Sequence, residues 1–237
     1  MKRPGLFVVA VLAFGLGGAA RCSADSLIVN GSFALPNVGA SWGMFANGSV
    51  PGWYTTDPAG DIEIDNPVVF GGGSSAYAGN QGDQSLEVNA YNPEDVYQTV
   101  TGLTAGQTYM LFWAYGDRPD SGDEELQVFF TPTTSLVGAT PVATDYDNLN
   151  GSNSMVLWTP NSVIVTATGA TEVLSFDGLN VSGTGNNGGI SYGNEIDAVS
   201  LTATAPEPST LLFFATGLGL LLMAWRRQRV LPVFTRR

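Results

Sequence analysis

Hydrophobic and polar residues alternate with a period of two in many short segments of this chain. The segments are rich in Val, Ile, Thr, Tyr, Phe and Trp and are bounded by Gly, Asn, Asp and Pro, which is typical of β-strands. Before Thr210 no window shows an apolar period of 3.6 residues, so no amphipathic helix is expected there. The strands predicted from this pattern are Ser26–Phe33, Asp61–Ile64, Gln84–Asn89, Val96–Thr101, Gln107–Tyr115, Glu125–Thr131, Met155–Trp158, Ser162–Ala167, Glu172–Phe176 and Glu195–Leu201.

The strand Gln107–Tyr115 is apolar on both of its faces. One face carries Tyr109, Leu111, Trp113 and Tyr115, and the other carries Met110, Phe112 and Ala114. Such a strand is expected in the middle of a sheet, with one side in the core and the other side covered or lining a groove. Many short strands without intervening helices favour an all-β fold, a two-sheet β-sandwich, over βαβ units.

Residues 1–24 have the pattern of a secretory signal peptide. Basic residues precede an apolar run at 6–20, which is the predicted signal helix, and small residues precede Asp25. A lipoprotein signal is the alternative because of Cys22. Arg21 stands directly before this cysteine, where a lipoprotein signal needs a small residue. We therefore expect cleavage before Asp25.

Residues 206–237 form a tail with three parts. Pro206, Glu207 and Pro208 come first, an uncharged apolar run at 210–225 follows, and Arg226, Arg227 and Arg229 make up the basic cluster 226–229. A helix of the length of that run spans about 24 Å, which is short of a hydrocarbon core of ~30 Å. The tail therefore predicts a transmembrane helix that anchors the chain only transiently in the inner membrane, with the arginines in the cytoplasm and the domain outside.

This tail resembles the PEP-CTERM sorting signal of Gram-negative bacteria. In that family an exosortase, a membrane cysteine transpeptidase, cuts near the Pro-Glu-Pro tripeptide and passes the protein towards the cell surface and its exopolysaccharide. The resemblance implies an exosortase-type transpeptidase as a partner, and the cell surface or the extracellular biofilm matrix as the destination. Residues 230–237 extend beyond the arginines, where such tails more often stop. An ordinary single-span anchor is the alternative.

The part of the chain between these segments, residues 25–205, is strongly acidic. One basic residue, Arg118, stands against twenty acids, which gives this part a net charge of −19. Such a domain repels phosphate backbones and anionic lipids, so nucleic-acid binding is excluded. Neutral glycans and divalent cations remain as partners, and the excess of acids also favours solubility outside the cell.

The composition also limits the chemistry that this chain can perform. Histidine is absent, and the single cysteine leaves with the signal peptide, so Ser-His-Asp catalysis, Cys-His catalysis and zinc sites with nitrogen or sulfur ligands are excluded. Glycoside hydrolysis needs only two carboxylates, and Glu63, Glu87 and Glu195 lie on predicted strands. We expect these glutamates to face solvent and the protein to be no enzyme. A carboxylate glycosidase is the alternative.

A second resemblance covers most of the exported part. The matching segments are Val29–Phe33, Val50–Trp53, Ile62–Ile64, Gln84–Asn89, the hairpin Val96–Tyr109 and Ile196–Leu201. In this order they resemble the choice-of-anchor C family, whose domains are similar to galactose-binding-like jelly rolls. The resemblance implies a two-sheet jelly-roll β-sandwich with glycan as the ligand class, and it supplies no fixed set of binding residues.

A structural calcium ion is the candidate cofactor, because calcium needs only oxygen ligands. Residues 117–125 and 145–150 are rich in oxygen ligands, but neither segment fits the twelve-residue loop of an EF-hand. Galactose-binding-like sandwiches often hold calcium between the first and last strands. The resemblance makes Asp197 the expected ligand on the last strand, whereas Ala34 stands where the other acid is expected.

Aromatic residues in predicted loops are the candidates for sugar binding. The apolar face of a pyranose stacks on Trp or Tyr, while amides and carboxylates bond its hydroxyls. Trp42 and Phe45 lie in one predicted loop, and Tyr91 and Asn92 lie in another. Trp42, Tyr91 and Asn92 are therefore the predicted ligand-binding residues. Three further tryptophans are expected in the core: Trp53, Trp113 and Trp158.

The sequence thus predicts an exported, non-catalytic β-sandwich that binds exopolysaccharide or is embedded in it and that is processed through its tail. The principal alternative is a structural matrix or surface-layer protein that binds no sugar.

Overall fold

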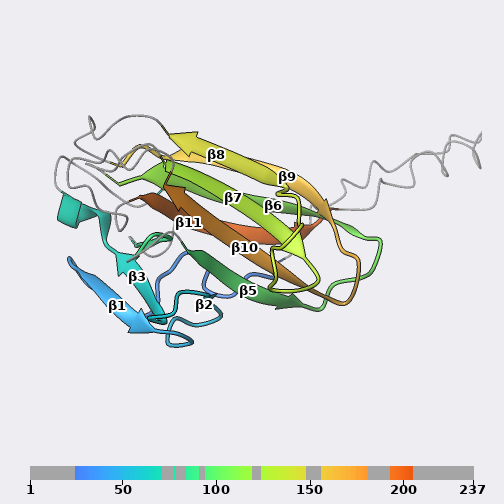
Figure 1. Ribbon diagram of the computed structural model, residues 1–237, viewed down its shortest axis with the longest axis horizontal. Helices are drawn as coiled ribbons and strands as arrows, with labels where there is room; N and C mark the ends of the chain where they lie inside the picture. The colour runs from blue at the N-terminus through green and yellow to red at the C-terminus, as the bar shows by residue number, and fades with distance from the viewer. Residues whose placement is uncertain are drawn as a thin grey trace, which may run out of the picture.

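The computed structural model describes residues 25–70, 77, 84–90, 94–118, 124–147, 156–180 and 193–204. These residues form two antiparallel sheets and one short 3-10 helix, and most strands lie roughly parallel to the long axis of the view in Figure 1. The predicted signal helix and the predicted transmembrane helix lie outside the described residues. Within the described ranges, no helix is long and apolar enough to cross a membrane.

The larger sheet has six strands in the order β1-β3-β4-β11-β6-β9. In that order they are β1 (Trp42–Ala46), β3 (Asp61–Asp65), β4 (Ser85–Glu87), β11 (Asn194–Ala203), β6 (Thr108–Asp117) and β9 (Thr159–Thr166). The 3-10 helix η1 (Pro67–Phe70) follows β3.

The smaller sheet has five strands in the order β2-β5-β10-β7-β8. They are β2 (Tyr54–Thr55), β5 (Asp95–Thr101), β10 (Thr171–Asn180), β7 (Glu124–Thr131) and β8 (Ala143–Asp147). The prediction of an all-β fold with two sheets is confirmed.

The core lies between the two sheets and is built around aromatic rings. Trp53 packs between Phe33 and Phe176, at 5.2 Å and 6.1 Å between ring centroids. Trp113 on β6 contacts Phe176 on β10 at 6.3 Å, so both sheets and the first segment of the chain meet in this cluster. All four side chains are fully buried. The predictions that Trp53 and Trp113 lie in the core are confirmed, and Trp158 is half-buried.

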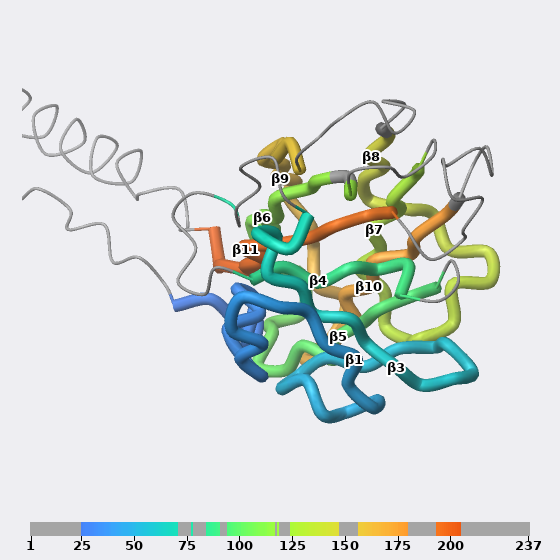
Figure 2. Tube along the Cα trace, turned by 90° about the vertical axis from the view of Figure 1, so that its left-hand side faces the viewer, coloured from blue at the N-terminus to red at the C-terminus, as the bar shows by residue number. Residues whose placement is uncertain are grey.

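The prediction of a strand at Ser26–Phe33 is wrong, because this segment forms turns. Asn30 and Phe33 have φ angles of 51° and 50°, which an extended strand cannot contain. The indole N–H of Trp53 donates to the Asn30 carbonyl at 3.2 Å, and the Val199 N–H donates to the Gly31 carbonyl at 2.7 Å. The first described segment therefore lies beside the last strand, as the blue and orange-red tubes show in Figure 2.

Three strands occur where the sequence predicts none: β1, β2 and β8. Trp42 and Phe45 lie on β1 and Asp145 lies on β8, although the sequence places all three in loops. Each of these strands is at the edge of its sheet and has one partner strand, so it buries few apolar residues and its pattern is weak. The described part of the predicted strand Met155–Trp158, residues 156–158, is not a strand, and β9 begins at Thr159.

The contact between the first segment and β11 predicts the effect of one substitution. A Cβ atom on Gly31 would lie 1.9 Å from the Val199 carbonyl oxygen, so Gly31→Ala forces the two segments apart. We expect the unfolding temperature of the purified protein to fall by about 3–10 °C, from a cost of ~1–3 kcal/mol. Gly169→Ala is the control, because its added Cβ meets its nearest atom at 3.7 Å. Equal unfolding temperatures for the two variants would contradict this packing.

Candidate functional site

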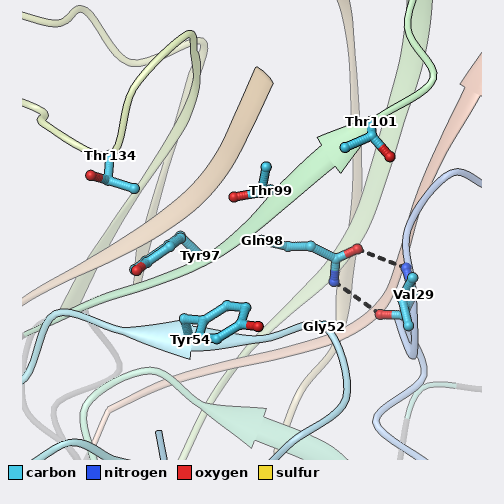
Figure 3. Close-up of a pocket in the computed structure, with 8 residues that line it drawn as sticks. All are labelled: Val29, Gly52, Tyr54, Tyr97, Gln98, Thr99, Thr101 and Thr134. Carbon is cyan, nitrogen blue, oxygen red and sulfur yellow. Dashed lines mark hydrogen bonds between the residues drawn. The ribbon is translucent and has the colours of Figure 1, made fainter. Parts of the chain in front are cut away.

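A groove of about 450 Å³ opens on the smaller sheet where its edge strand β2 ends (Figure 3). β2 pairs with β5 only through Tyr54 opposite Tyr97 and Thr55 opposite Val96. The Thr56 N–H also donates to the Asp95 carbonyl, and beyond Tyr97 the described residues give β5 no partner strand on that side, so the groove occupies the space. It is lined by Val29, Gly52, Tyr54, Tyr97, Gln98, Thr99, Thr101 and Thr134.

Two tyrosines form the aromatic side of the groove. Tyr54 on β2 and Tyr97 on β5 are cross-strand neighbours, and their rings stack at 5.8 Å between centroids and 26° between planes. The side chain of Tyr54 is 43% exposed, which is unusual for a large ring beside a core tryptophan. Neighbouring residues of a strand point to opposite faces, so the burial of Trp53 turns Tyr54 outwards.

The wall opposite the tyrosines is built by two loops that Gln98 and Gly52 hold together. The Gln98 amide donates to the Val29 carbonyl at 3.0 Å and accepts from the Val29 N–H at 2.7 Å, as Figure 3 shows. A Cβ atom on Gly52 would lie 2.9 Å from both the Gln98 amide nitrogen and the Val29 Cβ. Gly52 also has a φ of 85°, so the turn needs glycine for two reasons. The wall is therefore rigid before any ligand binds.

Hydroxyl groups line the remaining sides. Thr99 and Thr101 are exposed on β5, and Thr134 comes from the connection between β7 and β8 (Figure 3). The sheet thus presents an aromatic surface with polar groups around it, which is the pattern of a small-molecule or sugar site.

An acidic patch continues the same face of the sheet beyond Tyr97. Asp95 lies two residues before Tyr97 on β5, and Asp177 is directly opposite Asp95 on β10. The pKa of Asp95 is raised to about 7, mainly by burial and in part by the charge of the neighbouring Asp177. Burial also raises the pKa of Glu94, the preceding residue, to about 8.

A second group of carboxyls lies on the other sheet, on the face that points away from the core. Glu63 is opposite Glu87, and Glu87 is opposite Glu195, so three glutamates stand in a row across β3, β4 and β11. Asp65 lies beside this row on β3. We call these four residues the acidic row.

The expectation that the glutamates of the acidic row face solvent is wrong. Their exposed fractions are 5% for Glu63 and 0% for Glu87 and Glu195. Arg118, whose guanidinium lies over the Phe70 ring of η1 at 4.8 Å, donates to Glu87 Oε2 at 2.6 Å. Burial raises the pKa of Glu63 to about 8 and also raises those of the other three carboxyls.

The predicted site residues are distributed over both sheets. Trp42 is on β1, 55% exposed and opposite Asp65, so it lies on the larger sheet and away from the groove. Asp197 is buried on β11, and its two oxygens accept from the N–H groups of Tyr77 and Ala198 at 2.9 Å and 2.5 Å. Asp197 as a calcium ligand stays a prediction. Tyr91, Asn92 and the sorting residues lie outside the described part of the chain.

The two oxygen-rich segments meet where β7 pairs with β8, because Glu124 is directly opposite Asp147. Asp145 accepts the Trp113 indole N–H at 2.7 Å on β8, where it anchors a core residue. Glu124 and Glu125 belong to β7, and residues 119–123 and 148–150 lie outside the described ranges.

Sequence reasoning missed Tyr54 and Tyr97. The signal for Tyr97 was present, because Val96 and Val100 take the core face of β5 and leave Tyr97 on the other face. Tyr54 had no such signal, because a strand of two residues carries no period.

The C-terminal tail has a match among known families. Residues 204–228 match the family model described as the PEP-CTERM protein-sorting motif. The chain carries this sorting motif. It indicates an exported protein with a C-terminal sorting signal, and it implies processing by an exosortase. The predicted PEP-CTERM resemblance is confirmed for this segment, whereas no finding shows the choice-of-anchor C family.

Comparison with curated proteins finds no match to this chain. Solved structures that resemble it include the K3 cleaved adhesin domain of Lys-gingipain from Porphyromonas gingivalis W83, with a TM-score of 0.43 and 16% identity over 64% of this chain and 91% of that chain. The CBM22-1–GH10 modules of a Clostridium thermocellum endo-1,4-β-D-xylanase, complexed with xylohexaose, give a TM-score of 0.43. The identity is 14% over 77% of this chain and 28% of that chain.

The enzymatically active domain of tailspike protein 4 from bacteriophage CBA120 gives a TM-score of 0.41 and 14% identity over 76% of this chain. The match spans about a fifth of the tailspike chain, 21%. Likeness at these scores carries no inference about what this chain binds.

The raised pKa values of the acidic patch predict how stability depends on pH. The folded protein holds the Glu94 proton up to about pH 8, whereas the unfolded chain releases it near the ordinary value of 4.5. The unfolded state therefore binds fewer protons between these values, so stability falls as the pH rises through this window. We expect the unfolding temperature, measured in chelator, to fall from pH 5 to pH 8 and to fall by about 2–4 °C less in Glu94→Gln. Stability that rises over this range would overturn the assignment.

Proposed function

We propose that this protein is an exported, non-catalytic glycan-binding β-sandwich of the galactose-binding-like jelly-roll type. Its tail delivers it through transient anchoring in the inner membrane to the surface or extracellular matrix of a Gram-negative bacterium. Its ligand is a neutral exopolysaccharide, which it binds in the groove at Tyr54 and Tyr97.

One observation carries this proposal: a stacked and partly exposed tyrosine pair lies in an open groove bordered by hydroxyl groups. A pyranose ring presents an apolar face to such a platform and hydroxyls to its edges. The wall of the groove is fixed by Gln98 and Gly52, so binding costs little ordering of the protein. Asp177 is half-buried on the same face of the sheet and offers an acceptor to sugar hydroxyls.

The charge of the domain supports a neutral ligand. Arg118 is the one basic residue between positions 25 and 205, and it is engaged by Glu87 in the acidic row. An anionic polymer would find no free cation of this domain to bind and would be repelled by the net charge.

The non-catalytic part of the proposal is supported by the position of the glutamates. Glycosidase carboxylates must reach the bond that they cleave. Glu63, Glu87 and Glu195 are buried beneath Arg118 and Phe70 on the sheet opposite the groove.

The groove predicts a binding defect in two tyrosine variants. Tyr54→Ala and Tyr97→Ala remove the stacking platform, and we expect each to weaken binding about five- to tenfold, as ~1–1.5 kcal/mol implies. The measurement is affinity gel electrophoresis with exopolysaccharide purified from the producing bacterium. Trp42→Ala is the matched control, since it removes an exposed ring from the other sheet.

Three outcomes would overturn this assignment. Loss of retention in Trp42→Ala with normal retention in both tyrosine variants would place the site on the larger sheet. A wild-type protein that is not retained would favour a structural matrix protein. Reducing ends released from the polysaccharide would show a glycosidase.

The sorting motif predicts the fate of a tail variant. Glu207→Ala removes the one charge of the Pro-Glu-Pro tripeptide, and we expect the full-length chain to accumulate in the membrane fraction and the released form to disappear. Immunoblots of cell fractions measure both forms. The Tyr54→Ala protein keeps its tail and is expected to be released as the wild type is, which separates sorting from binding. Normal release of Glu207→Ala would contradict recognition of the tripeptide.

A further inference from the structure

The acidic row places like charges at the positions where strands normally pair favourable side chains. Glu63, Glu87 and Glu195 are direct cross-strand neighbours on β3, β4 and β11, which lie side by side in the larger sheet (Figure 2). Directly opposed like charges destabilise a sheet. Three such residues in a row, all buried, therefore destabilise the sheet unless a positive charge lies among them.

Within the described ranges of the chain, Arg118 is the one residue that supplies such a charge. Arg118 donates to Glu87 at 2.6 Å and lies 3.9 Å from Glu63, so it compensates the side of the row nearest to η1. The four carboxyls of the row face one guanidinium, and ionised carboxylates in a buried site are costly unless they are paired.

Two buried carboxyls in this row have no hydrogen-bond partner in regular geometry. Asp65 and Glu195 are both 0% exposed, and the polar groups close to their oxygens among the described residues are each other, Glu87 and the Ser85 hydroxyl. Glu195 lies opposite Glu87 on the side of the row away from Glu63. This differs from Asp197, whose oxygens accept from two backbone N–H groups. Native proteins seldom leave a buried carboxylate without a partner, so these oxygens point to a ligand.

We propose that Glu63, Asp65 and Glu87, together with Glu195, bind a calcium ion between strands β3, β4 and β11. One oxygen from each of Glu63, Asp65 and Glu87 lies within 4.8 Å of the others. An ion that binds oxygens at about 2.3–2.6 Å holds ligands up to ~5 Å apart, so these three reach a calcium ion together. The set consists only of carboxylates. These ligands suit calcium better than they suit softer metals, which favour nitrogen and sulfur ligands.

The place of the site in the fold gives the ion a structural role. β3 and β4 come from the first half of the chain and β11 is the last strand, so the ion joins segments that lie more than a hundred residues apart. The ion removes the repulsion along the row and thereby stabilises the folded domain. The site is on the sheet opposite the groove, so the proposal does not depend on glycan binding.

The test is thermal unfolding of the full exported chain, first stripped with chelator and then titrated with CaCl₂. Sites of extracellular modules have dissociation constants of about 10⁻⁴–10⁻³ M, so ~10 mM calcium is expected to raise the unfolding temperature by about 3–10 °C. Isothermal titration is expected to give one ion per chain. The same concentration of MgCl₂ is expected to give a smaller shift, because magnesium requires shorter bonds and dehydrates reluctantly.

Variants locate the ion. Glu195→Gln and Asp65→Asn keep the side-chain shapes and remove one charge each, and we expect both to lose the calcium shift. Glu125→Gln removes one charge from the other sheet, and this variant is expected to keep the calcium shift. Should the row variants fail to fold, Tb³⁺ titration of the wild type replaces them, with sensitised emission that saturates at one Tb³⁺ per chain and that an excess of calcium displaces.

The outcomes are distinct. No calcium shift in the wild type would show that protons alone neutralise the row, which overturns the proposal. A shift that survives in both row variants would place the ion elsewhere and also overturns it. Equal shifts with calcium and magnesium in every variant would reduce the effect to screening of surface acids, with the same consequence.

Discussion

The burial of Trp53 is the constraint on which the rest of the structure depends. Its indole packs between Phe33 and Phe176 and donates to the Asn30 carbonyl, so it joins the first segment of the chain to the smaller sheet. Because adjacent residues of an extended chain alternate in direction, the same burial turns Tyr54 into solvent beside Tyr97. Of these two consecutive residues, Trp53 thus belongs to the core and Tyr54 lines the groove.

The two outer faces of the sandwich differ in their chemistry. The smaller sheet carries stacked tyrosines and hydroxyls around an open groove, which suits a neutral ligand with both apolar and polar edges. The larger sheet carries the acidic row beneath Arg118 and Phe70, out of reach of a polymer. Successive side chains of a β-strand point alternately to the core and to the exterior. Each sheet can therefore carry a different set of residues on its outer face while its inner face fills the core.

The sorting motif begins at the last residue that the structure describes, Thr204. β11 closes at Ala203, and Thr204 still donates its N–H to the Thr108 carbonyl at 3.1 Å. The motif covers residues 204–228, so the Pro-Glu-Pro tripeptide begins two residues after Thr204. Cleavage near the tripeptide would therefore leave all the described strands of the sandwich in place.

The sequence by itself determined the properties that local patterns encode. The period-two segments located the long central strands such as β6 and β10, because buried strands on both sides of a core need apolar residues at every second position. Composition determined the excess of acids and, because the chain contains no histidine, excluded histidine chemistry, and the tail residues determined the sorting motif.

Only the tertiary structure decided which distant residues meet. Trp42 and Phe45 lie on an edge strand because β1 pairs with β3. Ser26–Phe33 forms turns because Trp53 and Val199 donate hydrogen bonds to its carbonyl groups. The glutamates at 63, 87 and 195 read as solvent-facing strand positions, yet η1 and Arg118 cover them and cross-strand register aligns them. Register and cover arise from contacts across more than a hundred residues of chain, and no local pattern of hydrophobic and polar residues contains them.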